Sequence, residues 1–125
     1  MRRVLIVEDD RYLLNFVSRL FRQRGYIVDS ASSCRGGFDL AHSDEYSLYL
    51  LDVNLPDGSG IELCDYIRTM SGTSPIIVYS GDGSNETPAM RAGANAFIPK
   101  SSFLEGQLNQ VLSYFENISS AEQVA

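Results

Sequence analysis

Five short apolar runs alternate along the chain with longer amphipathic segments, and this alternation limits the fold more than any other feature of the sequence. The runs cover residues 4–7, 27–31, 48–51, 76–79 and 96–98. The first of them, Val4-Leu5-Ile6-Val7, is apolar at every position, which predicts a strand buried on both faces. Strands that alternate with helical segments form parallel sheets, so we expect an α/β fold with a mostly parallel sheet of five strands.

The segments between the apolar runs show helical periodicity and helix-end signals. Helices are predicted over residues 11–24, 34–43, 61–70, 88–92 and 104–115. Asp10 precedes the first helix as its N-cap, and Gly25 stands where a C-cap glycine is common. Thr87 is predicted to cap the fourth helix, and Ser102 with Glu105 resembles a capping box for the fifth.

Composition excludes several classes of function. A length of 125 residues fits one domain, and 10 Lys and Arg against 16 Asp and Glu give a net charge of −6. This charge argues against a broad basic surface for nucleic acid or an anionic membrane. Cys34, Cys64 and the single histidine, His42, lack metal-ligand spacing, which excludes zinc sites and histidine-dependent nucleophilic catalysis. The two cysteines are predicted to be reduced thiols in core or half-buried positions, which favours a cytoplasmic location.

Polar residues stand at the ends of four of the five predicted strands. Glu8 and Asp9 follow the first strand, Asp52 the third, Ser80 the fourth, and Lys100 comes two residues after the fifth. The carboxyl ends of parallel strands meet at one edge of the sheet, so the three carboxylates are expected to repel one another unless a cation lies among them. Oxygen ligands without His or Cys indicate Mg²⁺. With a lysine and a hydroxyl nearby, the site is typical of phosphoryl transfer to a carboxylate nucleophile.

Four sequence motifs in this order are similar to those of one known family. They are VLIVEDD at residues 4–10, LLDVNLPDGSG at 50–60, IIVYSG at 76–81 and GANAFIPK at 93–100. From about residue 3 to 118 the chain resembles the receiver domain of two-component response regulators. The resemblance implies a flavodoxin-like (βα)5 fold with strand order 2-1-3-4-5 and helices on both faces. It places a receiver domain at residues 1–118, followed at 119–125 by a flexible tail or the start of a linker to an effector domain.

The resemblance also assigns roles to the acidic residues. It implies that Asp52 is the phosphoacceptor, which takes a phosphoryl group from a sensor histidine kinase or a phosphotransfer protein. Asp52 and Asp9 would bind Mg²⁺ directly, with Mn²⁺ as a substitute, and Glu8 would act through water. The backbone carbonyl of Asn54 would complete the metal site. Such a domain is a phosphoacceptor that catalyses its own phosphorylation and slow dephosphorylation, and is not an enzyme in the ordinary sense.

The resemblance further implies a two-state switch. Ser80 and Lys100 would bind the phosphoryl group, and Phe97 stands at the aromatic switch position. Ser80 would move towards the phosphate while Phe97 turns inward, reshaping the face made by the fourth helix, fifth strand and fifth helix. The sequence departs from the family at Ser101, where many receivers have a proline that supports a cis peptide, and at Phe97, where tyrosine is frequent. Neither departure removes a group that the chemistry needs.

The implied partners are the kinase or phosphotransfer protein, a downstream effector domain or protein, and a second copy of the chain on phosphorylation. Direct contact with nucleic acid or a membrane is not expected. Two alternatives remain beside the leading interpretation: a pseudo-receiver that binds a partner constitutively, and a flavodoxin-like cofactor binder or aspartate-dependent phosphatase. The acidic residues after the first strand disfavour a flavin phosphate loop, and Asn54 stands where such a phosphatase has a second aspartate.

Overall fold

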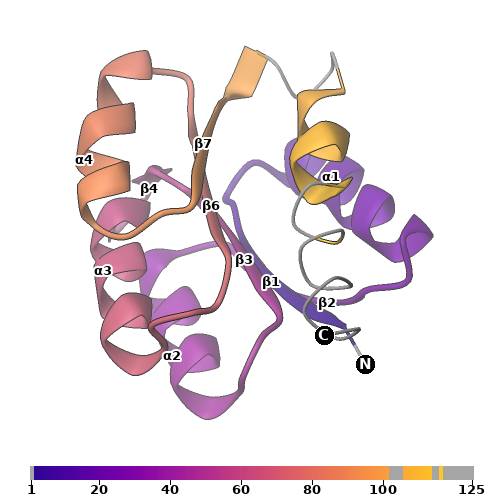
Figure 1. Cartoon of the computed structure of the whole chain (residues 1–125), viewed down its shortest axis with the longest axis horizontal. Helices are drawn as coiled ribbons and strands as arrows, with labels where there is room; N and C mark the ends of the chain where they lie inside the picture. Colours follow the sequence, from indigo (N-terminus) through magenta and orange to yellow (C-terminus); the bar gives the residue numbers. More distant parts are fainter. Residues whose placement is uncertain (1, 102–105, 114–115, 117–125) are drawn as a thin grey trace, which may run out of the picture.

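The computed structural model describes residues 2–101, 106–113 and 116 of the 125-residue chain. Its main sheet has five strands: β1 (Arg3–Val7), β2 (Ile27–Ala31), β3 (Leu48–Asp52), β6 (Ile76–Ser80) and β7 (Ala96–Pro99). They lie in the order β2-β1-β3-β6-β7, and every neighbouring pair is parallel (Figure 1). Counted over these five strands alone, the order is 2-1-3-4-5, so the predicted flavodoxin-like sheet is confirmed.

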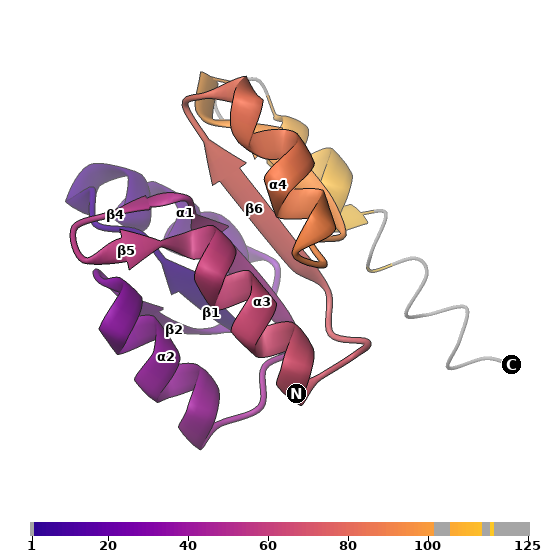
Figure 2. The ribbon, with the colours of Figure 1, turned by 90° about the vertical axis from the view of Figure 1, so that its left-hand side faces the viewer.

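Helices cover both faces of this sheet. They are α1 (Arg11–Gln23), α2 (Cys34–Ser43), α3 (Gly60–Met70) and α4 (Glu86–Arg91), and residues 107–113 are helical as well. In Figure 1, α2, α3 and α4 lie on one side of the sheet, and α1 and the helix at residues 107–113 lie on the other. Figure 2 shows α2, α3 and α4 from their outer side. Within the described ranges no helix has the length and apolar character needed to cross a bilayer.

Alternation of side chains along the strands divides the core into two layers. Leu5 and Val7 of β1 pack in the layer beneath α2, α3 and α4, whereas Val4 and Ile6 pack in the layer beneath α1. All four side chains are fully buried, as their uniform apolar character predicts. Burial of such a side chain contributes about 1.5–3 kcal/mol. Because β1 is held from both faces, the residue after it has a fixed position at the sheet edge.

The first helix has the ends that the sequence predicts. Asp10 is its N-cap, and the Asp10 carboxylate accepts hydrogen bonds from the backbone N–H groups of Tyr12 at 2.9 Å and Leu13 at 3.2 Å. After Arg24, Gly25 has a φ of 89°, which glycine adopts without the steric cost of a Cβ. Of the predicted fifth helix, residues 107–113 are confirmed as helical; the capping box at 102–105 and the tail at 119–125 lie outside the described residues.

The predicted start of the fourth helix was wrong. A 3₁₀ turn, η1 (Gly83–Asn85), runs directly into α4, which begins at Glu86 with Asn85 as its N-cap. Thr87 therefore lies inside the first turn and is not the cap. The physical reason is that Asp82 caps the preceding turn instead: its side chain accepts hydrogen bonds from the backbone N–H and hydroxyl of Ser84 at 2.9 and 2.8 Å.

A small hairpin, which was not predicted from the sequence, follows Asp52. Its strands are β4 (Asn54–Leu55) and β5 (Gly58–Ser59), and they pair in antiparallel fashion. The hairpin returns the chain so closely to β3 that a Cβ at Gly60 would collide with the backbone carbonyl oxygen of Asp52. Glycine at this position is thus required by the close approach of two backbone segments.

Candidate functional site

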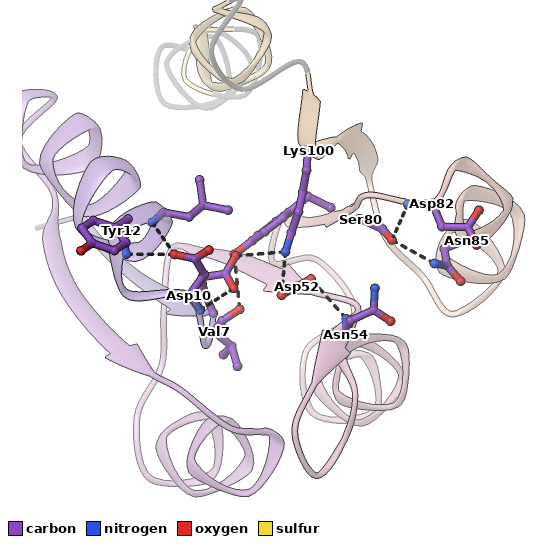
Figure 3. Close-up of polar contacts among 12 residues, drawn as sticks. Val7, Asp10, Tyr12, Asp52, Asn54, Ser80, Asp82, Asn85 and Lys100 are labelled. Atoms are coloured by element: carbon purple, nitrogen blue, oxygen red, sulfur yellow. Dashed lines mark hydrogen bonds and ion pairs between the residues drawn. The ribbon is translucent and has the colours of Figure 1, made fainter.

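Four of the five long strands deliver polar residues to one edge of the sheet, as predicted. Glu8 follows β1, Asp52 ends β3, Ser80 ends β6 and Lys100 follows β7. Figure 3 shows Lys100 extending from β7 towards Asp52 at the end of β3. Glu8, Asp52 and Ser80 are fully buried, whereas Asp9 beside them is exposed. The edge therefore combines three buried polar side chains with one accessible carboxylate, that of Asp9.

The carboxylates of Glu8, Asp9 and Asp52 form one cluster. Each offers an oxygen, and the three oxygens lie within 4.8 Å of one another. Three carboxylates at this spacing repel one another, and oxygen-only donors suit a hard divalent cation. The residues therefore fit Mg²⁺, which the sequence predicts here.

The carboxylate of Asp52 is bound at both oxygens. Its Oδ2 lies 3.0 Å from Lys100 Nζ, and its Oδ1 accepts a hydrogen bond from the backbone N–H of Asn54 at 3.2 Å. Desolvation lowers the pKa of Lys100, but the hydrogen bond and charge of Asp52, together with Glu8, outweigh it and raise the pKa overall. Lys100 thus stays protonated and partly neutralises the acidic cluster.

Glu8 is held by three donors. Tyr79 donates its hydroxyl hydrogen to Glu8 Oε1 at 2.9 Å, Lys100 Nζ lies 3.4 Å from the same oxygen, and the backbone N–H of Asp10 donates to Oε2 at 3.0 Å. Burial raises the pKa of Glu8 to about 7; Asp52 also raises this pKa, while the hydrogen bonds from Asp10 and Tyr79 lower it. Burial raises the pKa of Tyr79 well above its ordinary value, so its hydroxyl remains a donor.

Tyr79 was not among the residues predicted for the site. It is fully buried on β6 and packs in the layer beneath α1. The sequence contains a signal for it, because a tyrosine ends the aliphatic run Ile76-Ile77-Val78 and a buried tyrosine hydroxyl needs a polar partner. That signal does not identify the partner, Glu8, which follows a strand that is not adjacent to β6.

The hydroxyl of Ser80 is bonded to the loop that follows it. Ser80 Oγ accepts hydrogen bonds from the backbone N–H of Asp82 at 3.1 Å and from Asn85 Nδ2 at 2.9 Å. Figure 3 shows Ser80 together with Asp82 and Asn85, to the side of the contact between Lys100 and Asp52. Ser80 thus lies at the predicted edge, but its hydroxyl is bound to its own loop.

Phe97 is placed apart from the polar groups. It lies on β7 in register with Val78, is half-buried, and packs against the core layer beneath α2, α3 and α4. The peptide between Lys100 and Ser101 is trans, since the described residues contain no cis peptide bond. Phe97 is therefore part of the core beside the site, and the structure does not bring it among the carboxylates.

Asp57 contacts a neighbouring helix, a role that sequence reasoning missed. It accepts hydrogen bonds from the backbone N–H groups of Cys34 at 2.7 Å and Arg35 at 3.0 Å. The hydrogen bond from Arg35 and then that from Cys34 lower the pKa of Asp57. The hairpin that follows Asp52 is thereby fastened to the first turn of α2.

Comparison with known proteins gives a consistent result. The family model described as response regulator receiver domain matches residues 4–113. Response regulator ArlR of Staphylococcus epidermidis is 33% identical over 113 residues, which are 89% of this chain and 51% of that protein. Response regulator MprA of Mycolicibacterium vanbaalenii is 35% identical over 105 residues, which are 82% of this chain and 46% of that protein. The chain thus spans about half the length of the curated relatives it matches.

Solved structures share the fold. A CheY-like response regulator receiver domain protein from Methanospirillum hungatei matches with a TM-score of 0.85 and 25% identity, covering 97% of this chain and 98% of its own. A response regulator from Burkholderia pseudomallei, solved with a phosphorylated aspartic acid, calcium ion and citrate, has a TM-score of 0.80 and 20% identity, covering 98% of this chain and 73% of its own. At 20% identity the second likeness shows the fold alone.

Proposed function

The chain belongs to the response regulator receiver domain family, and from this premise we propose that it is a phosphorylation-controlled switch in which Asp52 accepts the phosphoryl group. The donor would be a phosphohistidine of a sensor kinase or a phosphotransfer protein. The observation that supports this most directly is the bonding of Asp52: one oxygen contacts Lys100 at 3.0 Å, and the carboxylate shares a cluster with Glu8 and Asp9.

The transfer uses the Asp52 carboxylate as nucleophile. One carboxylate oxygen attacks the phosphorus, the new O–P bond forms, and the P–N bond to the histidine breaks, so that the bond's electron pair stays with the imidazole. Lys100, already bonded to Asp52, would then pair with the oxygens of the phosphoryl group, because its ammonium is a compact point charge suited to phosphate. The amide of Asn54 holds the other oxygen of Asp52 and restricts the rotation of the carboxylate.

Four groups would hold Mg²⁺, with Mn²⁺ as a substitute: the carboxylates of Glu8, Asp9 and Asp52 and the backbone carbonyl of Asn54. Glu8 would act through water. The cation, when bound, neutralises charge on the phosphoryl oxygens as they approach the carboxylates. The cluster supports the assignment of the three side chains, since each offers an oxygen within 4.8 Å of the oxygens of the other two.

The output of the switch is a changed surface. We assign to Ser80 the step of leaving Asp82 and Asn85 to bind the phosphoryl group, and to Phe97 the step of turning inward behind it. The affected surface would comprise α4, β7 and the helix at residues 107–113. It would regulate an effector domain or protein, or form a homodimer, in the cytoplasm. Residues 1–118 would make up this receiver domain and 119–125 a tail or linker; neither nucleic acid nor a membrane would contact it directly.

Intact-mass spectrometry after incubation with acetyl phosphate tests this function. Wild type should gain one phosphoryl group in the presence of Mg²⁺ and none after chelation, and Asp52→Asn should gain none while retaining the fold by circular dichroism. Asp39→Asn, an exposed carboxylate on α2, is the matched control and should be labelled like wild type. Labelling of Asp52→Asn at the wild-type level would contradict the proposal. Absence of any adduct would favour the pseudo-receiver if beryllofluoride, which mimics the phosphoryl group, also fails to bind.

A further inference from the structure

The hydroxyl of Tyr79 links two strands that are not neighbours in the sheet. Tyr79 lies on β6 and is paired in register with Asp52 on β3, which separates β6 from β1. Its hydroxyl nevertheless lies 2.9 Å from Glu8 Oε1 and 3.5 Å from the carbonyl oxygen of Val7 at the end of β1. The side chain therefore extends past β3 to the start of the acidic cluster.

Glu8 needs such a partner more than an aspartate would. Glutamate has one more rotatable bond than aspartate, so holding its carboxylate in one position costs more side-chain entropy. The like charge of Asp52 also disfavours the position in which the carboxylate joins the cluster. Tyr79 fixes one oxygen and the backbone N–H of Asp10 fixes the other, so the carboxylate is held from two directions.

Tyr79 also lies beside the ammonium group of Lys100. Lys100 Nζ lies 5.5 Å from the centroid of the Tyr79 ring and 3.4 Å from the same Glu8 oxygen that the hydroxyl binds. An ammonium over an aromatic ring is attracted by the electron-rich face. One buried side chain thus touches both the acidic and the basic part of the site.

We propose that Tyr79 is a positioning residue of the acidic cluster, whose hydroxyl fixes Glu8 so that Glu8, Asp9 and Asp52 are presented together to a divalent cation. Removal of a group that orients a metal ligand commonly changes metal affinity by about 10–100-fold, and because Glu8 would act through water we expect the lower end of this range for Tyr79. The proposal rests on the proposed function only in taking this cluster as the cation site. A tyrosine that merely fills the core would need its ring and not its hydroxyl.

Binding of Mn²⁺ to the unphosphorylated protein tests the proposal without any phosphoryl transfer. Free Mn²⁺ is counted by electron paramagnetic resonance during titration of wild type, Tyr79→Phe and Tyr49→Phe. Tyr79→Phe removes the hydroxyl alone and should weaken binding about tenfold. Tyr49→Phe makes the same change in a buried tyrosine on β3, in register with Ile76 at the opposite end of the sheet, and should leave affinity unchanged.

A double-mutant cycle separates positioning from a general structural effect. In a Glu8→Ala background there is no carboxylate to hold, so adding Tyr79→Phe should cause no further loss of Mn²⁺ affinity. Equal affinities for wild type and Tyr79→Phe, or a full additional loss in the Glu8→Ala background, would overturn the proposal. Failure of wild type to bind Mn²⁺ would overturn the cation site and this role of Tyr79 with it. Normal Mn²⁺ binding without labelling by acetyl phosphate would contradict only the proposed function.

A measurement on wild type covers the case in which Tyr79→Phe does not fold. With ¹³C-labelled tyrosine rings, addition of Mg²⁺ should shift the NMR signals of Tyr79 in proportion to saturation of the site. The signals of Tyr49 should not shift. Unchanged Tyr79 signals at saturating Mg²⁺ would overturn the coupling between the hydroxyl and the cation site.

Discussion

Among the described residues Lys100 makes two ion pairs, and the one with Asp52 is the shorter, at 3.0 Å against 3.4 Å to Glu8. Asp52 is fully buried, and a buried carboxylate needs partners from the protein or a cation to compensate for the loss of its hydration. The same lysine would form ion pairs with two anions in succession, first with the carboxylate of Asp52 and then with the phosphoryl group. At the scale of single residues, we therefore expect Lys100 to couple phosphorylation of Asp52 to the conformational change. It is not expected to be essential for the phosphorylation itself.

Lys100→Ala should separate phosphorylation from its consequence. The nucleophile and the acidic cluster remain, so acetyl phosphate should still label Asp52 at a reduced level. Loss of a hydrogen bond to a charged group removes about 1.5–3 kcal/mol of interaction with the phosphoryl group. Mass spectrometry measures the label, and NMR chemical shifts measure the conformational response, most of which should be lost. Arg35→Ala, an exposed cation on α2, should keep both; an unchanged response in Lys100→Ala would contradict this role.

Asn85 is predicted to oppose the movement proposed for Ser80. Its side-chain amide donates to Ser80 Oγ at 2.9 Å and makes no capping hydrogen bond to α4, so removing it should affect the serine and not the helix. A neutral hydrogen bond contributes about 0.5–1.5 kcal/mol, so Asn85→Ala should bind beryllofluoride about two- to tenfold more tightly than wild type. Calorimetric titration measures this change. Asn15→Ala, on the exposed face of α1, should behave as wild type, and weaker binding by Asn85→Ala would count against a restraining role.

At the scale of elements, the site depends on the hairpin of β4 and β5 as well as on the long strands. The hairpin follows Asp52 directly, contains Asn54, and is fastened to α2 by two hydrogen bonds that Asp57 accepts. Strand pairing over two residues is too short to hold the hairpin by itself. The contact with α2 therefore fixes the segment that contributes Asn54 to the site.

Asp57→Asn should reduce the sensitivity of the fold to acid. Hydrogen bonds from the amides of Arg35 and Cys34 lower the pKa of Asp57 below its ordinary value of 3.8. A carboxyl group with a lowered folded-state pKa adds stability that is complete above the unfolded-state pKa and disappears as the pH falls through the folded-state pKa. Urea unfolding at pH 6 and pH 3 should therefore show a smaller loss on acidification for Asp57→Asn than for wild type.

The control for this change is Asp65→Asn, which removes an exposed carboxylate from α3. The difference between its urea midpoints at the two pH values should match that of wild type. If Asp57→Asn loses as much stability on acidification as wild type does, the contact with α2 does not depend on the charge of Asp57.

At the scale of the whole molecule, cation binding should be visible as stability. A ligand that binds only the native state stabilises it by RT ln(1 + [L]/Kd), about 2.7 kcal/mol at a hundredfold excess over Kd. Mg²⁺ should therefore raise the thermal midpoint of wild type, and Asp9→Asn should lose most of this rise because it removes the exposed carboxylate of the cluster. Differential scanning calorimetry measures both. Asp39→Asn should keep the full rise, and an equal rise in Asp9→Asn would exclude Asp9 as a ligand.

The sequence predicted those parts of the molecule that depend on the short apolar runs. The five strands and the meeting of Glu8, Asp52 and Lys100 at one edge follow from buried strands whose polar residues come directly after them. The fold class and strand order were confirmed, while the roles of the site residues remain predictions. The position of an apolar run determines where a strand lies, so it also determines where that strand ends.

The features that the sequence did not predict are contacts between distant segments. Asp57 bonds α2 and Tyr79 bonds Glu8, and the start of α4 depends on the cap formed by Asp82 in the preceding turn. Each of these residues has an ordinary local interpretation as a turn, core or loop residue. Only the packing of the folded chain selects the partner, so local pattern cannot identify it.

The ion pair of Lys100 has an experimental consequence beyond signalling, because Lys100 is the only lysine among the 125 residues. Its side chain is 29% exposed and ends 3.0 Å from Asp52. A reagent selective for primary amines therefore meets one side chain, and only the N-terminal amine competes with it. Reductive methylation with ¹³C-formaldehyde would place a spectroscopic label directly beside Asp52 in a chain with no substitution at all.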